Sequence, residues 1–369
     1  MPNPPSLPTY WDYLNLPEML SLQGGLEGDE SVLSSDELHF IIVHQVYELW
    51  FKLALREIRL AREQLAGPKV PEESIPYVVH HLRRVNEILR LAVEQFRLVE
   101  TLTPQDFLDF RDKLTPASGF QSFQLRELEI LLGLEDDQRE RYGKLHPLDP
   151  IRKLADRSPA GALAWGRIQE ARKGPTLRTA LHDWLYRAPI RGSSPGDEAD
   201  TEVIAAFVEE YLEGPAPRRR ETVERLVAAG VGDRADLNEK MRGSEEAARA
   251  FLTATDVPEA ERERTVRVRA AVLFIESYRD LPLLAWPRLL IDTVVEMEEQ
   301  LILFRNRHAR MVERTIGRRV GTGGSSGVDY LDATAKYRIF PELWTVRTLL
   351  LPRAQLPALP QAAMYGFAR

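Results

Sequence analysis

Apolar residues recur along this chain at spacings of three and four positions, which place them on one face of an α-helix. The strict alternation of a half-buried β-strand is nearly absent, and no hairpin dipeptide separates two such stretches. A long helix is predicted to begin at Ser34 and Ser35, whose hydroxyls suit a helix N-cap, and to end at the Gly-Pro pair 67–68. A second helix is predicted over about 72–102.

Helix start and stop signals define further elements. Thr103 followed by Pro104 is a typical N-cap and first helical position, and it predicts a short helix that ends near residue 114. Another helix is expected over about 121–134, and two long ones over about 258–279 and 287–317. The sequence therefore predicts an all-α fold with long core helices.

The whole chain, residues 1–369, is predicted to form a single large helical domain, but two of its regions differ in composition. Residues 1–30 contain many Pro and Gly residues and are predicted to form an N-terminal arm with a short helix near Leu16–Leu22. Residues from about 190 to 256 are highly charged and interrupted by Gly and Pro. They are predicted to form a helical insertion in the middle of the chain.

Composition excludes several kinds of protein. The 369 residues are 44% hydrophobic and 28% charged, which is enough for a sizeable core and a soluble surface. The net charge of −7 argues against nucleic-acid binding. No apolar run reaches the roughly 18 residues that span a bilayer, and the first residues lack the features of a signal peptide. The absence of cysteine fits a reducing compartment. We therefore expect a cytoplasmic protein that binds neither nucleic acid nor membrane.

Without cysteine, histidine is the main candidate metal ligand, and the seven histidines form no HExxH or similar close pair. His44 is the first candidate, because helical spacing places it on one face with Phe40, Tyr47 and Phe51. Two interpretations are open on these residues. His44 is either a core histidine hydrogen-bonded to a neighbour or a histidine that faces a planar ligand.

His308 is the second candidate, near the end of a predicted long helix. It shares a helix face with Phe304, Met311 and Val312, and a lone histidine in such a setting can be the proximal ligand of a haem iron. The alternative interpretation is a solvated basic helix end, which the helix macrodipole favours.

Two further segments contain groups that could bind a small ligand. Arg111 would emerge beside Phe107, one helical turn away, and its guanidinium suits a carboxylate. Alternatively, Arg111 is a surface arginine paired with Asp112 or Glu127. The segment 321–327, Gly-Thr-Gly-Gly-Ser-Ser-Gly, combines backbone freedom with hydroxyl groups. It is typical either of a loop over a ligand or of a flexible linker.

Taken together, several segments resemble the tryptophan 2,3-dioxygenase family. They are YWDYL at 10–14, FIIVHQVYELWFK at 40–52, DFLDFR at 106–111, PASGFQS at 116–122, and His308 followed by GTGGSSG at 321–327. The resemblance implies a helical, haem b-dependent homotetramer with one haem per subunit, its core helices surrounding a haem pocket. Such an enzyme inserts both atoms of O2 across the indole C2–C3 bond of L-tryptophan. The product is N-formylkynurenine, in the first step of tryptophan degradation by the kynurenine pathway.

The resemblance also implies which residues hold the haem. His308 corresponds to the proximal iron ligand. His44 corresponds to the distal histidine, placed to hydrogen-bond the indole N–H. Ser118 corresponds to the serine near the haem edge, with Gly119 beside it.

A further group of residues corresponds to the substrate pocket of the family. Arg111 resembles the arginine that binds the substrate carboxylate. Thr322 resembles the loop threonine that binds the ammonium and carboxylate groups. Phe40 and Phe107 resemble the aromatic walls of the pocket.

Other positions concern assembly and departures from the family pattern. Tyr10 and Tyr13 resemble N-terminal residues that reach into the site of a neighbouring subunit. Phe304 stands where a tryptophan is common, and the region 190–256 matches poorly. Two other functions stay open: a family member that acts on a modified indole, and a helical haem sensor without enzymatic activity.

Overall fold

The computed structural model describes residues 7–141, 146–214, 216–322, 327–359 and 362–366. Within these ranges the chain forms sixteen α-helices and no β-strand, apart from one isolated bridge between Ile190 and Ser193. The prediction of an all-α single domain is confirmed. No helix in the described part of the chain has the length and apolarity needed to cross a bilayer.

The first eight α-helices in chain order are α1 (Tyr10–Leu14), α2 (Leu16–Met19), α3 (Ser35–Leu65), α4 (Ser74–Val99), α5 (Pro104–Arg111), α6 (Phe123–Leu132), α7 (Asp149–Ala155) and α8 (Pro159–Ala171). The other eight are α9 (Leu177–Arg187), α10 (Asp200–Glu213), α11 (Ala216–Ala228), α12 (Arg234–Leu252), α13 (Glu259–Ser277), α14 (Ala285–Ile316), α15 (Val328–Thr334) and α16 (Pro341–Leu349). Short 3₁₀ helices are η1 (Glu30–Val32), η2 (Asp112–Leu114), η3 (Gly119–Gln121), η4 (Pro282–Leu284), η5 (Arg353–Gln355) and η6 (Ala362–Tyr365).

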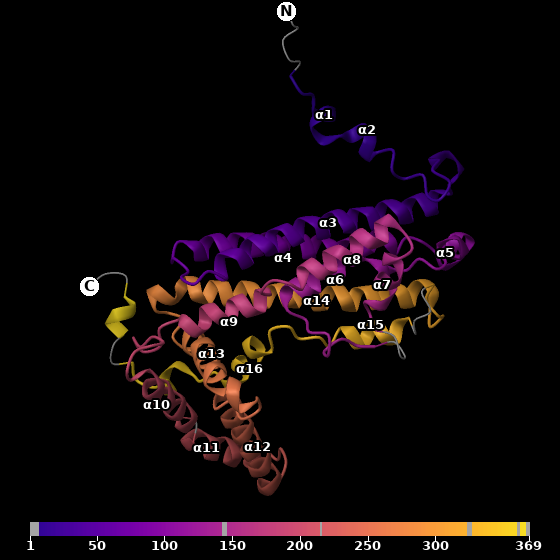
Figure 1. Cartoon of the computed structure of the whole chain (residues 1–369). Helices are drawn as coiled ribbons and strands as arrows, with labels where there is room; N and C mark the ends of the chain where they lie inside the picture. The colour runs from indigo at the N-terminus through magenta and orange to yellow at the C-terminus, as the bar shows by residue number, and fades with distance from the viewer. Residues whose placement is uncertain (1–6, 142–145, 215, 323–326, 360–361, 367–369) are drawn as a thin grey trace, which may run out of the picture.

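Three long helices, α3, α4 and α14, lie side by side and form the frame of the molecule (Figure 1). α3 and α4 follow each other in the chain and are antiparallel. α4 and α14 are parallel, because Asn86 donates a hydrogen bond to the Thr293 carbonyl at 3.1 Å and Glu100, the residue after α4, pairs with Arg307 at 2.6 Å. The shorter helices α5, α6 and α15 pack against this frame and complete the walls of the site.

Local signals explain where these helices begin and end. The Ser34 hydroxyl accepts a hydrogen bond from the Glu37 N–H at 3.1 Å, as expected for the N-cap of α3. Thr103 caps α5 in the same way. Gly133 ends α6 with a φ of 117°, a left-handed conformation that favours glycine. The predicted boundaries of α3, α13 and α14 agree with the structure to within a few residues.

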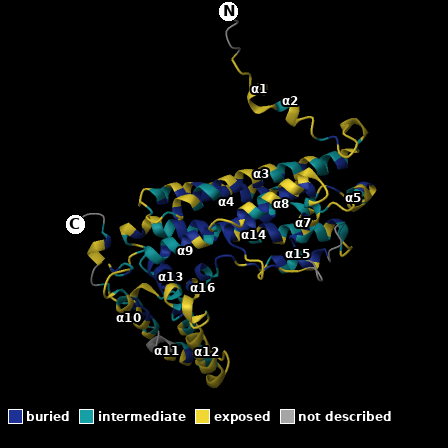
Figure 2. Ribbon diagram, viewed as in Figure 1, coloured by how far each residue is buried: buried dark blue, intermediate teal, exposed yellow. Residues whose placement is uncertain are grey.

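The buried side chains lie mainly where the long helices meet, whereas α1, α2 and much of α12 are exposed (Figure 2). One large apolar cluster joins α3, α4, α6, α9, α13 and α14. A second cluster contains four aromatic residues from α3, α4 and α14: Tyr47, Phe51, Phe96 and Phe304. This second cluster packs against one side of the site described below.

The N-terminal arm extends away from the helical body (Figure 1). It contains α1 as well as the predicted short helix. The periodic pattern did not reveal α1, because this helix is five residues long and is stabilised by a capping box between Thr9 and Asp12. Tyr10 and Tyr13 on α1 are 70% and 80% exposed. That they contact a neighbouring subunit stays a prediction.

The region from about 190 to 256 contains α10, α11 and α12. α10 packs against α13 and buries Phe207 in the main core. α12 lies further out, and Leu252 at its end is the buried residue of that helix. That this region is an insertion stays a prediction.

Two glycines on α8 make a matched test of the packing. A Cβ at Gly161 would lie 2.1 Å from the Leu154 carbonyl oxygen, whereas a Cβ at Gly166 would meet no heavy atom within 4 Å. Gly161→Ala is expected to reduce the free energy of unfolding by about 1–3 kcal/mol. Gly166→Ala is expected to increase it by about 0.5–1 kcal/mol, because alanine favours the helix. Chemical denaturation measures both, and equal effects would contradict the close approach of α7 and α8.

Candidate active site

A cavity of about 610 Å³ lies between α3, α5, α6 and α14, and its walls are largely apolar. Its volume is in the usual range for cofactor and ligand sites, roughly 300–1,000 Å³. Residues far apart in the sequence meet in its walls, among them eight of the predicted site residues: Phe40, His44, Phe107, Arg111, Ser118, Gly119, His308 and Thr322. The other two, Tyr10 and Tyr13, lie on the exposed arm, outside the cavity.

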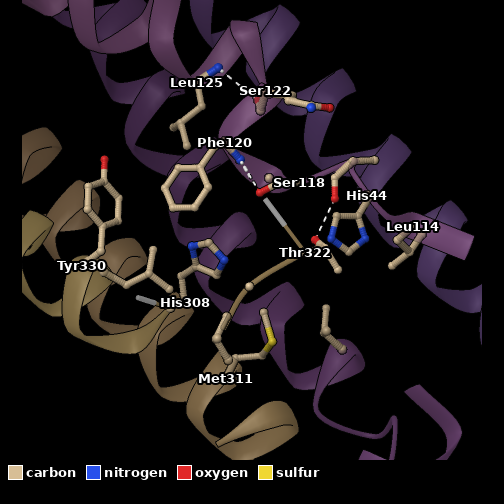
Figure 3. A pocket seen from close by; sticks show the side chains of 18 of the residues that line it. His44, Leu114, Ser118, Phe120, Ser122, Leu125, His308, Met311, Thr322 and Tyr330 are labelled. Carbon is tan, nitrogen blue, oxygen red and sulfur yellow. Dashed lines mark hydrogen bonds between the residues drawn. The ribbon is translucent and has the colours of Figure 1, made fainter. Parts of the chain in front are cut away.

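His44 faces the cavity from α3 (Figure 3). Its Nδ1 lies 2.7 Å from the Phe40 carbonyl oxygen, which can only accept, so Nδ1 carries the proton and Nε2 is an acceptor. The two rings also pack together, with centroids 4.0 Å apart. Although the His44 ring is accessible from the cavity, desolvation by the surrounding protein lowers its pKa. His44 is therefore both a hydrogen-bonded histidine and one that can bind a ligand.

His308 faces the same cavity from α14 (Figure 3). Its ring stacks on Phe96, with centroids 5.7 Å apart and an interplanar angle of 15°. Burial, with smaller contributions from His44 and Arg126, lowers the pKa of His308 to about 4, so the imidazole is neutral at pH 7. Neither ring nitrogen has a hydrogen-bond partner among the described residues.

These properties fit one kind of metal site. A neutral imidazole is the form of histidine that binds a metal. Within the described residues no group of three or more His, Asp or Glu side chains could hold an ion. A metal at His308 would therefore take most of its ligands from a cofactor, as iron does in haem. The solvated helix-end interpretation of His308 is wrong, because α14 continues to Ile316 and the ring lies in the cavity wall.

Arg111 reaches from α5 toward the segment that precedes α15. Its Nη2 donates to the Val320 carbonyl at 2.6 Å, and its Nε is shielded from solvent without a hydrogen-bond partner in the described ranges. The alternative interpretation, in which Arg111 forms an ion pair with Asp112 or Glu127, is wrong. Glu127 is instead paired with two other arginines, from α3 and α8.

Thr322 lies in the same segment. Its hydroxyl donates to the Ala117 carbonyl at 2.7 Å, next to the predicted pair Ser118 and Gly119. The Ser118 hydroxyl accepts from the Phe120 N–H at 3.3 Å and begins η3. Two polar groups from distant parts of the chain, Arg111 and Thr322, thus come to one end of the cavity. The central part of the Gly/Ser loop, Gly323–Ser326, lies outside the described residues.

The cavity wall also contains a buried charged cluster that the sequence pattern did not predict. Arg126 and Arg305 line the cavity and both contact Glu129, at 2.9 and 3.1 Å, and Arg139 contacts Glu129 from behind at 2.5 Å. Burial opposes ionisation of Glu129, but the charges of the three arginines outweigh it and lower the pKa of Glu129 to about 2. One signal could have revealed part of the cluster: Arg126 and Glu129 are three residues apart on α6, a spacing that suits an ion pair on one helix face.

The fold and this cavity define a class of protein. It is a helical protein in which one neutral histidine would hold a cofactor in an apolar cavity, beside a guanidinium and a hydroxyl that suit a carboxylate. Comparison with known proteins identifies one family. A family model described as tryptophan 2,3-dioxygenase matches residues 5–350, and the chain belongs to this family.

Curated relatives agree across bacteria and animals. The chain is 48% identical over 366 residues to a tryptophan 2,3-dioxygenase of Sorangium cellulosum, covering 97% of this chain and 87% of the relative. It is 47% identical over 371 residues to tryptophan 2,3-dioxygenase 2 of Ralstonia nicotianae, covering 98% of both. Tryptophan 2,3-dioxygenase B of Danio rerio is 32% identical over 362 residues, covering 95% of this chain and 84% of the relative.

Proposed function

We propose that this protein is a haem-dependent tryptophan 2,3-dioxygenase. It inserts both atoms of O2 across the indole C2–C3 bond of L-tryptophan and gives N-formyl-L-kynurenine, the first step of tryptophan degradation by the kynurenine pathway. Because both oxygen atoms remain in the product, the reaction consumes no reductant. Family membership over residues 5–350 supports this proposal. The observation that carries it is the cavity in which the neutral His308, without a hydrogen-bond partner among the described residues, and the acceptor His44 face one apolar space.

The proposed cofactor is haem b, one per subunit, with His308 as its protein ligand. When bound, haem supplies the binding and activation of O2. The apolar walls exclude water from it, and the Phe96 ring stacked on His308 restricts the orientation of the imidazole. Ser118 and Gly119 would lie at its edge.

The chain's own residues orient the substrate. The Nε2 of His44 accepts a hydrogen bond from the indole N–H, because its Nδ1 is committed to the Phe40 carbonyl. Phe40 and Phe107, whose ring centroids are 5.9 Å apart, contact each other and form an aromatic wall for the indole. Arg111 binds the carboxylate, and Thr322 binds the ammonium and carboxylate groups. Such a pocket selects an intact α-amino acid over indole or tryptamine.

We also propose a homotetramer, in which the arm with Tyr10 and Tyr13 reaches the site of a neighbouring subunit. The arm exposes several apolar side chains, and α3 exposes Ile42, Leu49 and Leu53 on one helix face. A cytoplasmic location is proposed as well, supported by the absence of cysteine. Light scattering coupled to size exclusion measures the assembly, and a monomer with full activity would contradict the shared site.

The decisive experiment uses purified, haem-loaded ferrous protein with O2 and L-tryptophan. Formation of N-formyl-L-kynurenine, followed by its near-ultraviolet absorbance, supports the proposal. Parallel assays with a ring-methylated tryptophan and with tryptamine separate the alternatives. Faster turnover of the methylated substrate would favour a family member that acts on a modified indole. No product from fully loaded protein would favour a haem sensor.

The pKa of His44 predicts a pH dependence. Desolvation lowers this pKa below its usual 6.5, while the Phe40 carbonyl and the Glu48 carboxylate partly raise it. As pH falls through the lowered pKa, Nε2 takes up a proton and no longer accepts the indole N–H. The kcat/KM for L-tryptophan should therefore be level near neutrality and fall about tenfold per pH unit on an acid limb below 6.5.

A matched variant tests the assignment of this limb. Glu48→Gln removes a charge that raises the pKa of His44, so the acid limb should move to lower pH. An acid limb that stays in place in Glu48→Gln, or that persists in His44→Ala, would assign the titration to another group.

A further inference from the structure

Three arginines surround a single buried carboxylate, Glu129, in the wall of the cavity. Arg126, Arg139 and Arg305 contact Glu129 at 2.9, 2.5 and 3.1 Å. The Nε of Arg139 also lies 3.4 Å from the carboxylate of Asp136, which pairs with Arg172 as well, at 2.5 Å. Arg126 and Arg305, the two that line the cavity, are left to share Glu129. The arginines of this cluster therefore outnumber the carboxylates that they contact.

Both cavity-lining arginines also make few hydrogen bonds. Arg126 and Arg305 are 7% and 8% exposed. The side chain of each makes one hydrogen bond to the described residues, in both cases to Glu129, although a guanidinium carries five N–H donors. The Nε of Arg126 is shielded from solvent and has no partner there. The Arg305 guanidinium also lies over the Tyr337 ring, 4.7 Å from its centroid. Because buried charges are normally paired and hydrogen-bonded, the Nε of Arg126 is suited to a further acceptor.

Other groups nearby do not supply that acceptor. Glu48 is the other carboxylate among the described residues that line the cavity, and it accepts a hydrogen bond from Gln124 at 2.8 Å. Tyr330 and Tyr337 lie beside the arginines, but burial raises the pKa of both phenols, so they stay neutral at pH 7. An anion that enters the cavity with a ligand would supply this acceptor and offset the excess positive charge.

We propose that Arg126 and Arg305 bind a carboxylate of the cofactor, one of the two propionate groups of haem. The proposal rests on the proposed function for the identity of the cofactor. Arg305 lies one turn before His308 on α14, and Arg126, Arg305 and His308 all line the same cavity. Arg111 comes instead from α5 and contacts the segment before α15, which leaves it for the carboxylate of the amino acid. Guanidinium groups suit both carboxylates because they can bind two oxygens at once.

The test compares two porphyrins in the apoprotein of the full chain. Ferric protoporphyrin IX carries two charged propionates, whereas in its dimethyl ester both are neutral methyl esters. Binding is followed by the shift of the Soret absorbance. The wild-type protein should bind the free acid at least about tenfold more tightly, the effect of one charge-assisted hydrogen bond. Equal affinity for both porphyrins would overturn the proposal without any variant.

Substitutions locate the effect. Arg126→Met and Arg305→Met keep side-chain length and remove the charge, and each should reduce the preference for the free acid severalfold. Arg126→Lys should restore part of it. Arg111→Met, in the same cavity, is the matched control and should leave the preference unchanged. A purely structural role of the two arginines predicts equal losses for both porphyrins, and that result would overturn the proposal.

The experiment also separates this inference from the proposed reaction, since it needs neither O2 nor tryptophan. Arg111→Met could lose the preference for the free acid while Arg126→Met keeps it. This result would mean that Arg111 binds the propionate, and it would overturn the assignment. A wild-type protein with the expected preference that forms no N-formyl-L-kynurenine would contradict the reaction and support the carboxylate site. Absence of a Soret shift with either porphyrin would overturn both.

Discussion

Replacing His308 by alanine is expected to abolish stable haem binding, and with it the Soret band of the purified protein. His308 is a neutral imidazole that faces the cavity without a hydrogen-bond partner in the described chain, and no other metal-binding cluster exists there. The variant loses no hydrogen bond of its own, so the helical fold should persist. Absorbance spectra and haem content per chain measure the first effect, and far-ultraviolet circular dichroism the second.

The control for this prediction is the other histidine of the cavity. His44→Ala should retain haem and lose activity, because its Nε2 is assigned to the substrate. Added imidazole should partly restore haem binding to His308→Ala by occupying the space of the missing ring. A normal Soret band in His308→Ala would refute the ligand assignment. Loss of haem in His44→Ala alone would mean that the two roles are reversed.

Arg111→Ala is expected to raise the KM for L-tryptophan by about 10- to 150-fold. This range corresponds to about 1.5–3 kcal/mol for a hydrogen bond between charged groups. Tryptamine has no carboxylate, so its weak turnover should change little in the same variant. Steady-state kinetics with both substrates measure the difference.

Two variants define the limits of the Arg111 prediction. Arg111→Lys should recover only part of the affinity, because an ammonium group cannot bind both carboxylate oxygens as a guanidinium does. Lys113→Ala removes an exposed cation close to Arg111 in the chain, which pairs with Glu37 at 2.8 Å, and should leave the KM unchanged. An unchanged KM in Arg111→Ala would show that the carboxylate is bound elsewhere.

Local patterns predicted much of this structure. Ser34 and Thr103 each cap the helix that they were expected to begin, because capping depends on neighbouring residues in the chain. The spacing of Phe40 and His44 placed both on one face of α3, and their rings do contact each other. Such features are visible in sequence because they involve a few consecutive turns of one helix.

Features that depend on distant residues were not predictable in the same way. Arg126 and Arg305 share one carboxylate although nearly half of the chain separates them, and no short-range pattern records that meeting. The bond from Arg111 to the Val320 carbonyl is another long-range contact, and the sequence suggested local ion pairs in its place. The assignment of individual site residues therefore depended on the family resemblance as much as on pattern.

The hydrogen bonds at the polar end of the cavity bear on how the enzyme would release what it binds. Arg111 donates to the Val320 carbonyl and Thr322 to the Ala117 carbonyl. An amino acid that takes these donors would exchange one set of bonds for another, so recognition of its charged groups adds less to the net affinity than the new contacts alone suggest. When the product leaves, Arg111 and Thr322 can again donate hydrogen bonds to the Val320 and Ala117 carbonyls. The site can thus be selective for a zwitterion without holding it tightly, which favours repeated turnover.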